Sequence, residues 1–226
     1  MKPLRPIPWP HRNPTRRALL AIYGALRKHY GHRHWWPGET PFEVIVGAIL
    51  TQNAAWKNVE QAVGNLKNEG LLSPYKMSRV PFRRLARLIR PAGYFNVKAR
   101  RIRHFLAFLT DRYGQDLKRM FDTPYRKLRE ELLGVNGIGE ETADSILLYA
   151  GQRPTFVVDA YTRRIFTRHR FLTGREKYDE IQKIFTRLLP RKTALYNDYH
   201  AQVVEIGKDY CRTTPRCTNC PLRRYL

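Results

Sequence analysis

Residues 131–164, ELLGVNGIGEETADSILLYAGQRPTFVVDAYTRR, decide the fold. Gly134, Gly137 and Gly139 lie between the end of one helical pattern and the start of another. Because glycine tolerates positive φ and leaves the backbone uncovered, Gly137-Ile138-Gly139 predicts a tight hairpin between two helices. Its amide N–H groups, at the start of the second helix, would face an anion such as a phosphate. Ile138 would turn inward and fill the hairpin.

A carboxylate follows the second helix of this pattern. Phe156, Val157 and Val158 form a buried run that delivers Asp159 to the start of a further helix. The stretch therefore holds a phosphate anchor and a carboxylate about twenty residues apart. A plain helix-turn-helix with an N-capping aspartate would show the same local pattern.

The whole pattern resembles a known family. LLGVNGIGEETA followed by VVDAYTRR resembles the helix-hairpin-helix, Gly-Pro-rich loop and Asp signature of the endonuclease III superfamily of DNA glycosylases. GYFNVKA at residues 93–99 resembles the glycine-tyrosine-x-asparagine-x-lysine-alanine turn of that family. No strand period persists, and the resemblance implies an all-α fold of two helical domains with the active-site cleft between them. It places a six-helix barrel at residues 34–153 and a second helical domain at residues 1–33 and 154–226.

Composition indicates the partner but not the activity. Lys and Arg exceed Asp and Glu by 42 − 19 = +23 in 226 residues, which favours a polyanionic partner. The resemblance implies double-stranded DNA with a damaged base, bound by a monomer. The sequence contains no run of eighteen apolar residues, so it predicts no membrane-spanning helix. Residues 1–14 predict a proline-rich extended arm and no secretory signal. We expect a cytoplasmic, nucleoid-associated protein.

Polar side chains follow an apolar helix at residues 41–50. Phe42, Ile45, Val46, Ile49 and Leu50 form a buried stripe, which ends in Thr51-Gln52-Asn53. In the family this segment inserts where the flipped base was, so the resemblance places the wedge at Asn53 with Gln52 beside it. Asn53 could instead cap the helix. The full predicted DNA-binding set is Gln52, Asn53, Gly137, Ile138, Gly139 and Thr142.

The predicted chemistry is hydrolysis of an N-glycosidic bond. A carboxylate near the sugar stabilises oxocarbenium character and orients water, and Asp159 is the candidate. Burial raises the pKa of a carboxylate whereas helix N-terminal amides lower it, and the sequence leaves open which effect prevails. Bifunctional relatives carry a lysine where this chain has Glu141, and a glutamate cannot form a Schiff base. We therefore expect a monofunctional glycosylase that leaves an abasic site.

Four residues form the predicted base pocket. Pro37 excludes Trp36 from the helical region, so an indole of Trp35 or Trp36 could stack on an extruded base. Glu141 could accept hydrogen bonds from an exocyclic amine. This combination looks most like the 3-methyladenine glycosylase branch and favours an alkylated purine, which an aromatic stack selects by cation–π attraction. The alternatives are packing between domains for the tryptophans and an exposed first-turn acid for Glu141.

Three cysteines lie near the end of the sequence, with the spacing Cys211-x5-Cys217-x2-Cys220. The pattern resembles the family's iron–sulfur loop, in which four thiolates hold a [4Fe–4S] cluster. The fourth cysteine would fall at Leu226, where it is absent. The cluster could have a non-cysteine fourth ligand, could be labile or could have been lost, and zinc with a further ligand such as His200 is another option.

Two other functions remain open at this point. One is a bifunctional glycosylase and abasic-site lyase of the endonuclease III type, acting on damaged or mismatched bases. The other is a non-catalytic helix-hairpin-helix module that only binds DNA. Asp159 and the paired tryptophans favour an enzyme over such a module.

Overall fold

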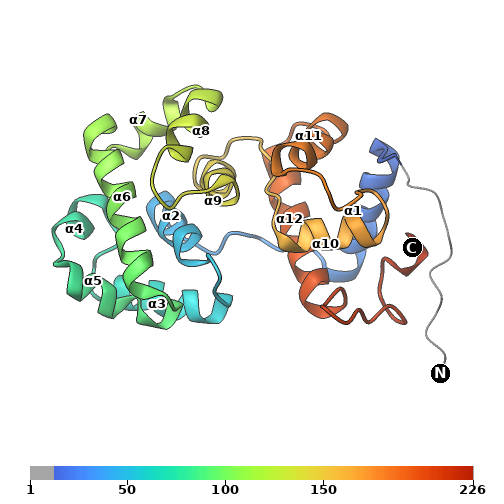
Figure 1. The fold of residues 1–226 in the computed structure, drawn as a ribbon, viewed down its shortest axis with the longest axis horizontal. Coiled ribbons are helices and arrows are strands. Elements are labelled where there is room, and N and C mark those ends of the chain that lie inside the picture. The colour runs from blue at the N-terminus through green and yellow to red at the C-terminus, as the bar shows by residue number, and fades with distance from the viewer. Residues whose placement is uncertain (1–12, 226) are drawn as a thin grey trace. The chain divides into compact units, whose positions relative to one another are not determined.

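The computed structural model describes residues 13–225 (Figure 1). These residues form helices and turns and no strand, which confirms the all-α prediction. They divide into two compact units, one of residues 13–33 with 158–225 and one of His34–Val157. The extended arm predicted for residues 1–14 lies almost wholly outside the described residues, as does Leu226.

The unit His34–Val157 is built around one central helix. Helix α2 (Pro41–Leu50) contacts the four elements α3, α6, α9 and the π-helix (bounds below). Every residue from Phe42 to Leu50 is buried, so α2 is covered on all sides and not along a single stripe. Thr40 caps its start, accepting a hydrogen bond from the Glu43 N–H at 3.1 Å. The other helices of this unit are α3 (Trp56–Asn68), α4 (Pro74–Arg79), α5 (Phe82–Leu88), α6 (Phe95–Tyr113), α7 (Leu117–Asp122), α8 (Tyr125–Leu133) and α9 (Glu140–Ser145), with a 3-10 turn at Arg90–Ala92.

The second helix of the hairpin changes its winding. Helix α9 continues as a π-helix, Ile146–Ala150, which ends at Gly151. The sequence predicted one regular helix through Ala150, because the apolar spacing does not distinguish the two windings. Since the π-helix has wider turns, it changes which side chains face α2.

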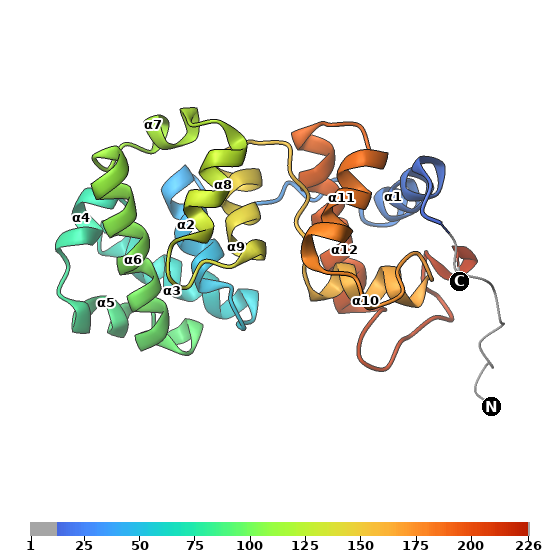
Figure 2. The same cartoon turned by 45° about the horizontal axis from the view of Figure 1, so that its top comes forward.

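The other unit combines both ends of the described chain. Helices α1 (Arg16–Tyr30) and α10 (Ala160–Arg168) both pack on α12 (Thr193–Asp209), and α11 (Tyr178–Leu188) lies against α1 (Figure 2). A short 3-10 turn follows at Arg223–Tyr225. Thr15 caps α1 as expected, accepting from the Ala18 N–H at 3.2 Å. Within residues 13–225, no helix is both long enough and apolar enough to cross a membrane.

Candidate functional site

The predicted hairpin lies between α8 and α9. Gly137 has a φ of +90°, so this position needs glycine. Gly139 has an ordinary extended backbone (φ −92°) and is the N-cap of α9. No atom lies within 4 Å of where a Gly139 Cβ would stand, so the backbone there is open to a close partner. Ile138 is buried inside the hairpin, as predicted.

Gln52 supports the hairpin from within. Its amide nitrogen donates to the Gly137 carbonyl at 3.0 Å and to the Thr142 hydroxyl at 2.8 Å. Arg101 donates to the Gln52 side-chain oxygen. Thr142 is buried, and its hydroxyl accepts the hydrogen bond from Gln52. In this structure the side chains of Gln52 and Thr142 therefore fix the hairpin's shape.

One buried ammonium ties together the two turns that precede α3 and α6. Lys98 donates to the Leu50 carbonyl at 2.8 Å and to the Ala92 carbonyl at 2.6 Å, and its side chain is 1% exposed. Burial, with a further contribution from the charge of Arg101, lowers the pKa of Lys98 from 10.5 to about 8. The lysine of the GYFNVKA turn is therefore a buried structural residue that holds the two turns together.

The two turns that Lys98 connects each expose a side chain. Asn53 is exposed at φ +51°, and Tyr94 is 72% exposed at φ +44°. The C-cap of α2 is Thr51, whose hydroxyl donates to the Gly47 carbonyl at 2.7 Å, so Asn53 does not cap that helix. Sequence reasoning assigned no role to Tyr94. The signal that the sequence offered was its position directly after Gly93, in the turn that leads into α6.

The paired tryptophans belong to an aromatic cluster. The Trp36 ring lies 5.1 Å from Trp56 and 5.2 Å from Tyr149, and Trp35 lies 4.8 Å from Trp56, between centroids. Trp36 also passes over Gly47, where an added Cβ would stand 3.1 Å from the ring. Both predicted tryptophans therefore pack inside their own unit. The sequence analysis did not predict that Trp56 and Tyr149 belong to this cluster. The position of Trp56, shortly after the polar turn at residues 51–53, was a signal in the sequence. Tyr149 lies in the π-helix, whose winding the sequence did not indicate.

A cavity of about 150 Å³ opens beside this cluster. Trp36, Trp56, the exposed Pro37, Glu43 and Glu60 line it, and so does Lys67, which pairs with Glu39. An aromatic wall is suited to a flat cationic or electron-poor group. Glu141, the fourth predicted pocket residue, does not line this cavity.

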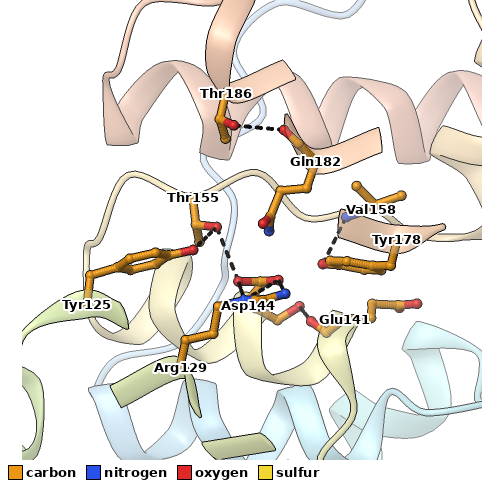
Figure 3. A network of polar contacts seen from close by, with 10 residues as sticks. Tyr125, Arg129, Glu141, Asp144, Thr155, Val158, Tyr178, Gln182 and Thr186 are labelled. Atoms are coloured by element: carbon orange, nitrogen blue, oxygen red, sulfur yellow. Dashed lines mark hydrogen bonds and ion pairs between the residues drawn. The ribbon is translucent and has the colours of Figure 1, made fainter. Parts of the chain in front are cut away.

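Glu141 lies in the exposed first turn of α9. Its backbone carbonyl accepts a hydrogen bond from the Ser145 hydroxyl at 2.7 Å. Figure 3 shows its side chain extending away from the buried Asp144. No lysine stands at this position, which is where the family resemblance places the Schiff-base lysine.

Asp144 is a buried carboxylate that sequence reasoning missed. It is fully buried and accepts two bonds from Arg129, from Nε at 3.0 Å and from Nη2 at 3.1 Å (Figure 3). Thr155 donates to the same carboxylate at 3.2 Å, and the Tyr125 hydroxyl lies 3.1 Å from Thr155 Oγ1. Such a bidentate pair has defined geometry. It fastens α8 to α9 on either side of the hairpin.

The candidate catalytic carboxylate lies in the other unit, at the start of α10. Asp159 Oδ1 accepts the Thr162 N–H at 2.7 Å, which makes Asp159 the N-cap, as predicted. Its Oδ2 lies 3.6 Å from Nε2 of His200, on α12. Burial raises the pKa of Asp159, but the nearby His200 and the Thr162 N–H together hold it below its usual value. The lowered pKa favours the ionised carboxylate at neutral pH, so these contacts outweigh the effect of burial.

A family model described as "HhH-GPD superfamily base excision DNA repair protein" matches residues 46–191. The chain belongs to the HhH-GPD superfamily. It is 49% identical over 208 residues to a putative DNA repair glycosylase of Methanocaldococcus jannaschii, covering 92% of this chain and 94% of that protein. It is 30% identical over 186 residues to endonuclease III of Sulfolobus acidocaldarius, covering 81% of this chain and 80% of that protein. The predicted endonuclease III-like resemblance is confirmed, and the chain is a DNA glycosylase of base excision repair.

Two solved structures share the fold of this HhH-GPD protein. One is the Helicobacter pylori 3-methyladenine DNA glycosylase bound to 1,N6-ethenoadenine, with a TM-score of 0.72, 29% identity, and coverage of 85% of this chain and 95% of that one. The other is a non-covalent endonuclease III–DNA complex, with a TM-score of 0.79, 23% identity, and coverage of 94% and 95%. The second likeness concerns the fold alone.

The three cysteines of this HhH-GPD chain line one cavity of about 230 Å³. None of them forms a disulfide, and Arg168 donates to Cys211 Sγ at 3.3 Å. Burial, with the neighbouring thiols, raises the pKa of Cys220. Among residues 13–225, no three His, Cys, Asp or Glu side chains stand close enough together to hold a metal ion. His200 faces Asp159 and does not line this cavity, so it is not the fourth ligand.

Proposed function

We propose that this glycosylase hydrolyses the N-glycosidic bond of an alkylated purine flipped from duplex DNA and leaves an abasic site. The observation that carries the proposal is the ionised Asp159 at the start of α10, held by His200 and the Thr162 N–H. An anion of this kind stabilises the positive charge that develops on the sugar in the transition state. Because the carboxylate is already ionised and fixed, little reorganisation is needed during the reaction.

The proposal of a monofunctional enzyme rests on which amines the chain offers. Glu141 stands where the family resemblance places the Schiff-base lysine, and a carboxylate cannot form an imine. Lys98 has a lowered pKa, which would suit a nucleophile, but it is 1% exposed and donates to two carbonyls. It therefore cannot reach a sugar without unfolding its surroundings. These facts support base release without strand cleavage.

The aromatic cluster supports a purine with reduced electron density. Trp36 and Trp56 line a cavity together with Glu43, Glu60 and Lys67, and the faces of the two aromatic rings favour a cation. The Helicobacter pylori relative is named for 3-methyladenine and is bound to 1,N6-ethenoadenine. We infer that the aromatic rings select a cationic or electron-poor base by stacking.

Duplex DNA is the proposed partner because both the net charge of the chain and the geometry of the hairpin favour binding to phosphates. The net charge of +23 favours a polyanion, and the open backbone at Gly139 precedes the first turn of α9. Contacts to phosphate carry no sequence information, which suits an enzyme that searches for rare damage. Asn53 and Tyr94, both exposed on turns held by Lys98, are the proposed contacts to the opened base pair.

A panel of duplexes tests this function. Each duplex carries one 3-methyladenine, ethenoadenine, uracil or thymine glycol, and strand breaks are measured with and without hot alkali. We expect release of the alkylated purines and breaks only after alkali. Borohydride should trap no covalent protein–DNA adduct. A preference for thymine glycol, or breaks without alkali, would favour the bifunctional endonuclease III-type activity instead.

A further inference from the structure

Helices α4 and α5 lie in a long stretch of sequence that has basic residues but no acidic ones. Residues 70–110 contain ten Lys and Arg and no Asp or Glu. None of the basic residues on α4, α5 and the 3-10 turn after them belongs to the hairpin or to the aromatic cluster. Those that are exposed there are Lys76, Arg79, Arg83, Arg84, Arg87 and Arg90.

Most of these exposed cations have no partner within the chain. Arg84 forms an ion pair with Glu69, and the Arg79 guanidinium lies 3.7 Å from the centroid of the Tyr75 ring. The rest make no hydrogen bond, ion pair or ring contact with their side-chain cations to any residue from 13 to 225. They are Lys76, Arg83, Arg87 and Arg90.

Helix α5 presents two of these unpaired arginines on one side. Arg83 and Arg87 are four residues apart, so they are neighbours on the helix surface. Leu85 and Ala86 are buried, and α5 packs on α6. Like charges at this spacing destabilise a helix. A bound anion would remove the repulsion, which no acidic side chain of the stretch relieves.

The chain leads directly from these arginines to the turn that exposes Tyr94. Arg90 lies four residues before Tyr94, in the 3-10 turn that contacts both α5 and α6. Figures 1 and 2 both show α5 and α9 on opposite sides of α6. Because the hairpin precedes α9, the hairpin and α5 lie on different sides of the helix that begins after Tyr94.

We propose that the α5 face, defined as Arg83, Arg87 and Arg90, binds phosphates of the same duplex that the hairpin binds, on the other side of the opened base pair. This inference rests on the proposed function, in which Tyr94 contacts that base pair. Arginine pairs with phosphate through two parallel hydrogen bonds. A helix of seven residues is about 10 Å long, which corresponds to about three base-pair steps of 3.4 Å. Anchors on both sides hold the duplex in place while one base leaves the stack.

Salt-dependent binding to duplexes of different lengths tests the inference. Fluorescence anisotropy measures the affinity of the full-length protein for a duplex with a stable abasic analogue and about ten base pairs on each side of it. In two further duplexes, one side or the other is shortened to about two base pairs. The slope of log K against log salt should be less steep by about 1.8 in Arg83→Ala/Arg87→Ala, because each lost phosphate contact removes about 0.9. This difference should persist on one shortened duplex and vanish on the other.

Two further variants separate a phosphate contact from a change in net charge. Lys118→Ala/Arg119→Ala removes the same charge from exposed residues of α7, which follows the far end of α6. Since α6 has 19 residues, that end is about 28 Å from Tyr94. This control should keep the wild-type slope on every duplex. Arg83→Lys/Arg87→Lys keeps both charges and should retain most of the slope.

Three results would overturn the inference. The first is an unchanged slope in Arg83→Ala/Arg87→Ala, which would favour an acidic protein as the partner of the α5 face. The second is an equal change in Lys118→Ala/Arg119→Ala. The third is a difference of the same size on all three duplexes, because the contact would then lie outside either flank. A wild-type slope near zero would instead contradict DNA as the partner, and with it the proposed function itself.

Discussion

Replacing Lys98 by methionine should weaken the unit His34–Val157 and loosen two turns at once. Methionine fills a similar volume but cannot donate to the Leu50 and Ala92 carbonyls, which lie 2.8 Å and 2.6 Å from the ammonium. A hydrogen bond to a charged donor contributes about 1.5–3 kcal/mol. Methionine also avoids the cost of burying the ammonium charge, but it leaves two carbonyls without a donor, so we expect the free energy of unfolding to fall by about 1–3 kcal/mol at pH 7. Affinity for an abasic duplex should fall too, because Asn53 and Tyr94 lie on these turns.

The loss should depend on pH in a defined direction. Folding lowers the pKa of Lys98 from 10.5 to about 8, so the unfolded chain binds more protons between these values. Stability contributed by this group therefore rises with pH from about 8 to 10.5, by up to about 3 kcal/mol. Other groups titrate in this range, but they are common to the wild type and the variant. The difference between the two isolates Lys98.

Chemical denaturation at a series of pH values between about 7 and 10.5 measures this difference. The exposed Lys57, replaced by methionine, is the control and should change the stability little. Two results would refute the reasoning. One is a Lys98→Met variant as stable as the wild type at pH 7, and the other is a difference that stays flat up to pH 10.5.

Three shorter predictions concern the site. His200→Leu should raise the pKa of Asp159 by removing its neighbouring charge, so the acid limb of the excision rate should move to higher pH; an unmoved limb would show that His200 does not act on Asp159. Trp36→Ala should weaken binding of a cationic methylated purine by about 1–3 kcal/mol or more, and of an undamaged base by less; equal losses in single-turnover assays would contradict base selection by the ring. Gly139→Val should weaken binding to every duplex alike, and the wild-type affinity should fall with salt at a slope of about −4 to −5 if some five phosphates are neutralised. A slope near zero in fluorescence anisotropy titrations would contradict phosphate contact.

Local patterns in the sequence predicted the elements that are determined by residues close together in the sequence. The apolar run at residues 41–50, the glycines of the hairpin and Asp159 after its buried run each depend on spacing within a few residues. The burial of α2 on every side was not predicted, because periodicity describes one helix and not what surrounds it. The conformational need of Gly137 was predicted, whereas Gly139 adopts an ordinary extended conformation and leaves room instead.

The remaining site residues act through contacts between distant parts of the chain. His200 reaches Asp159 from another helix, and Arg129 reaches Asp144 across the hairpin. Gln52 has the residue type expected of a DNA-contacting side chain, yet it is occupied by hairpin atoms. Spacing within one segment carries no information on such contacts, so they become visible only when the helices are packed.

The central claim is that the Asp159 carboxylate stabilises the transition state of base release. Asp159→Asn removes the charge but keeps a residue that caps helices well. Asp116→Asn is the matched control, because Asp116 also caps a helix, α7, by accepting the Arg119 N–H at 3.1 Å. Single-turnover release of 3-methyladenine should fall by about 100-fold or more in Asp159→Asn, with DNA affinity near the wild-type value and the control unaffected. A fall of less than about tenfold, or an equal fall in Asp116→Asn, would contradict the account.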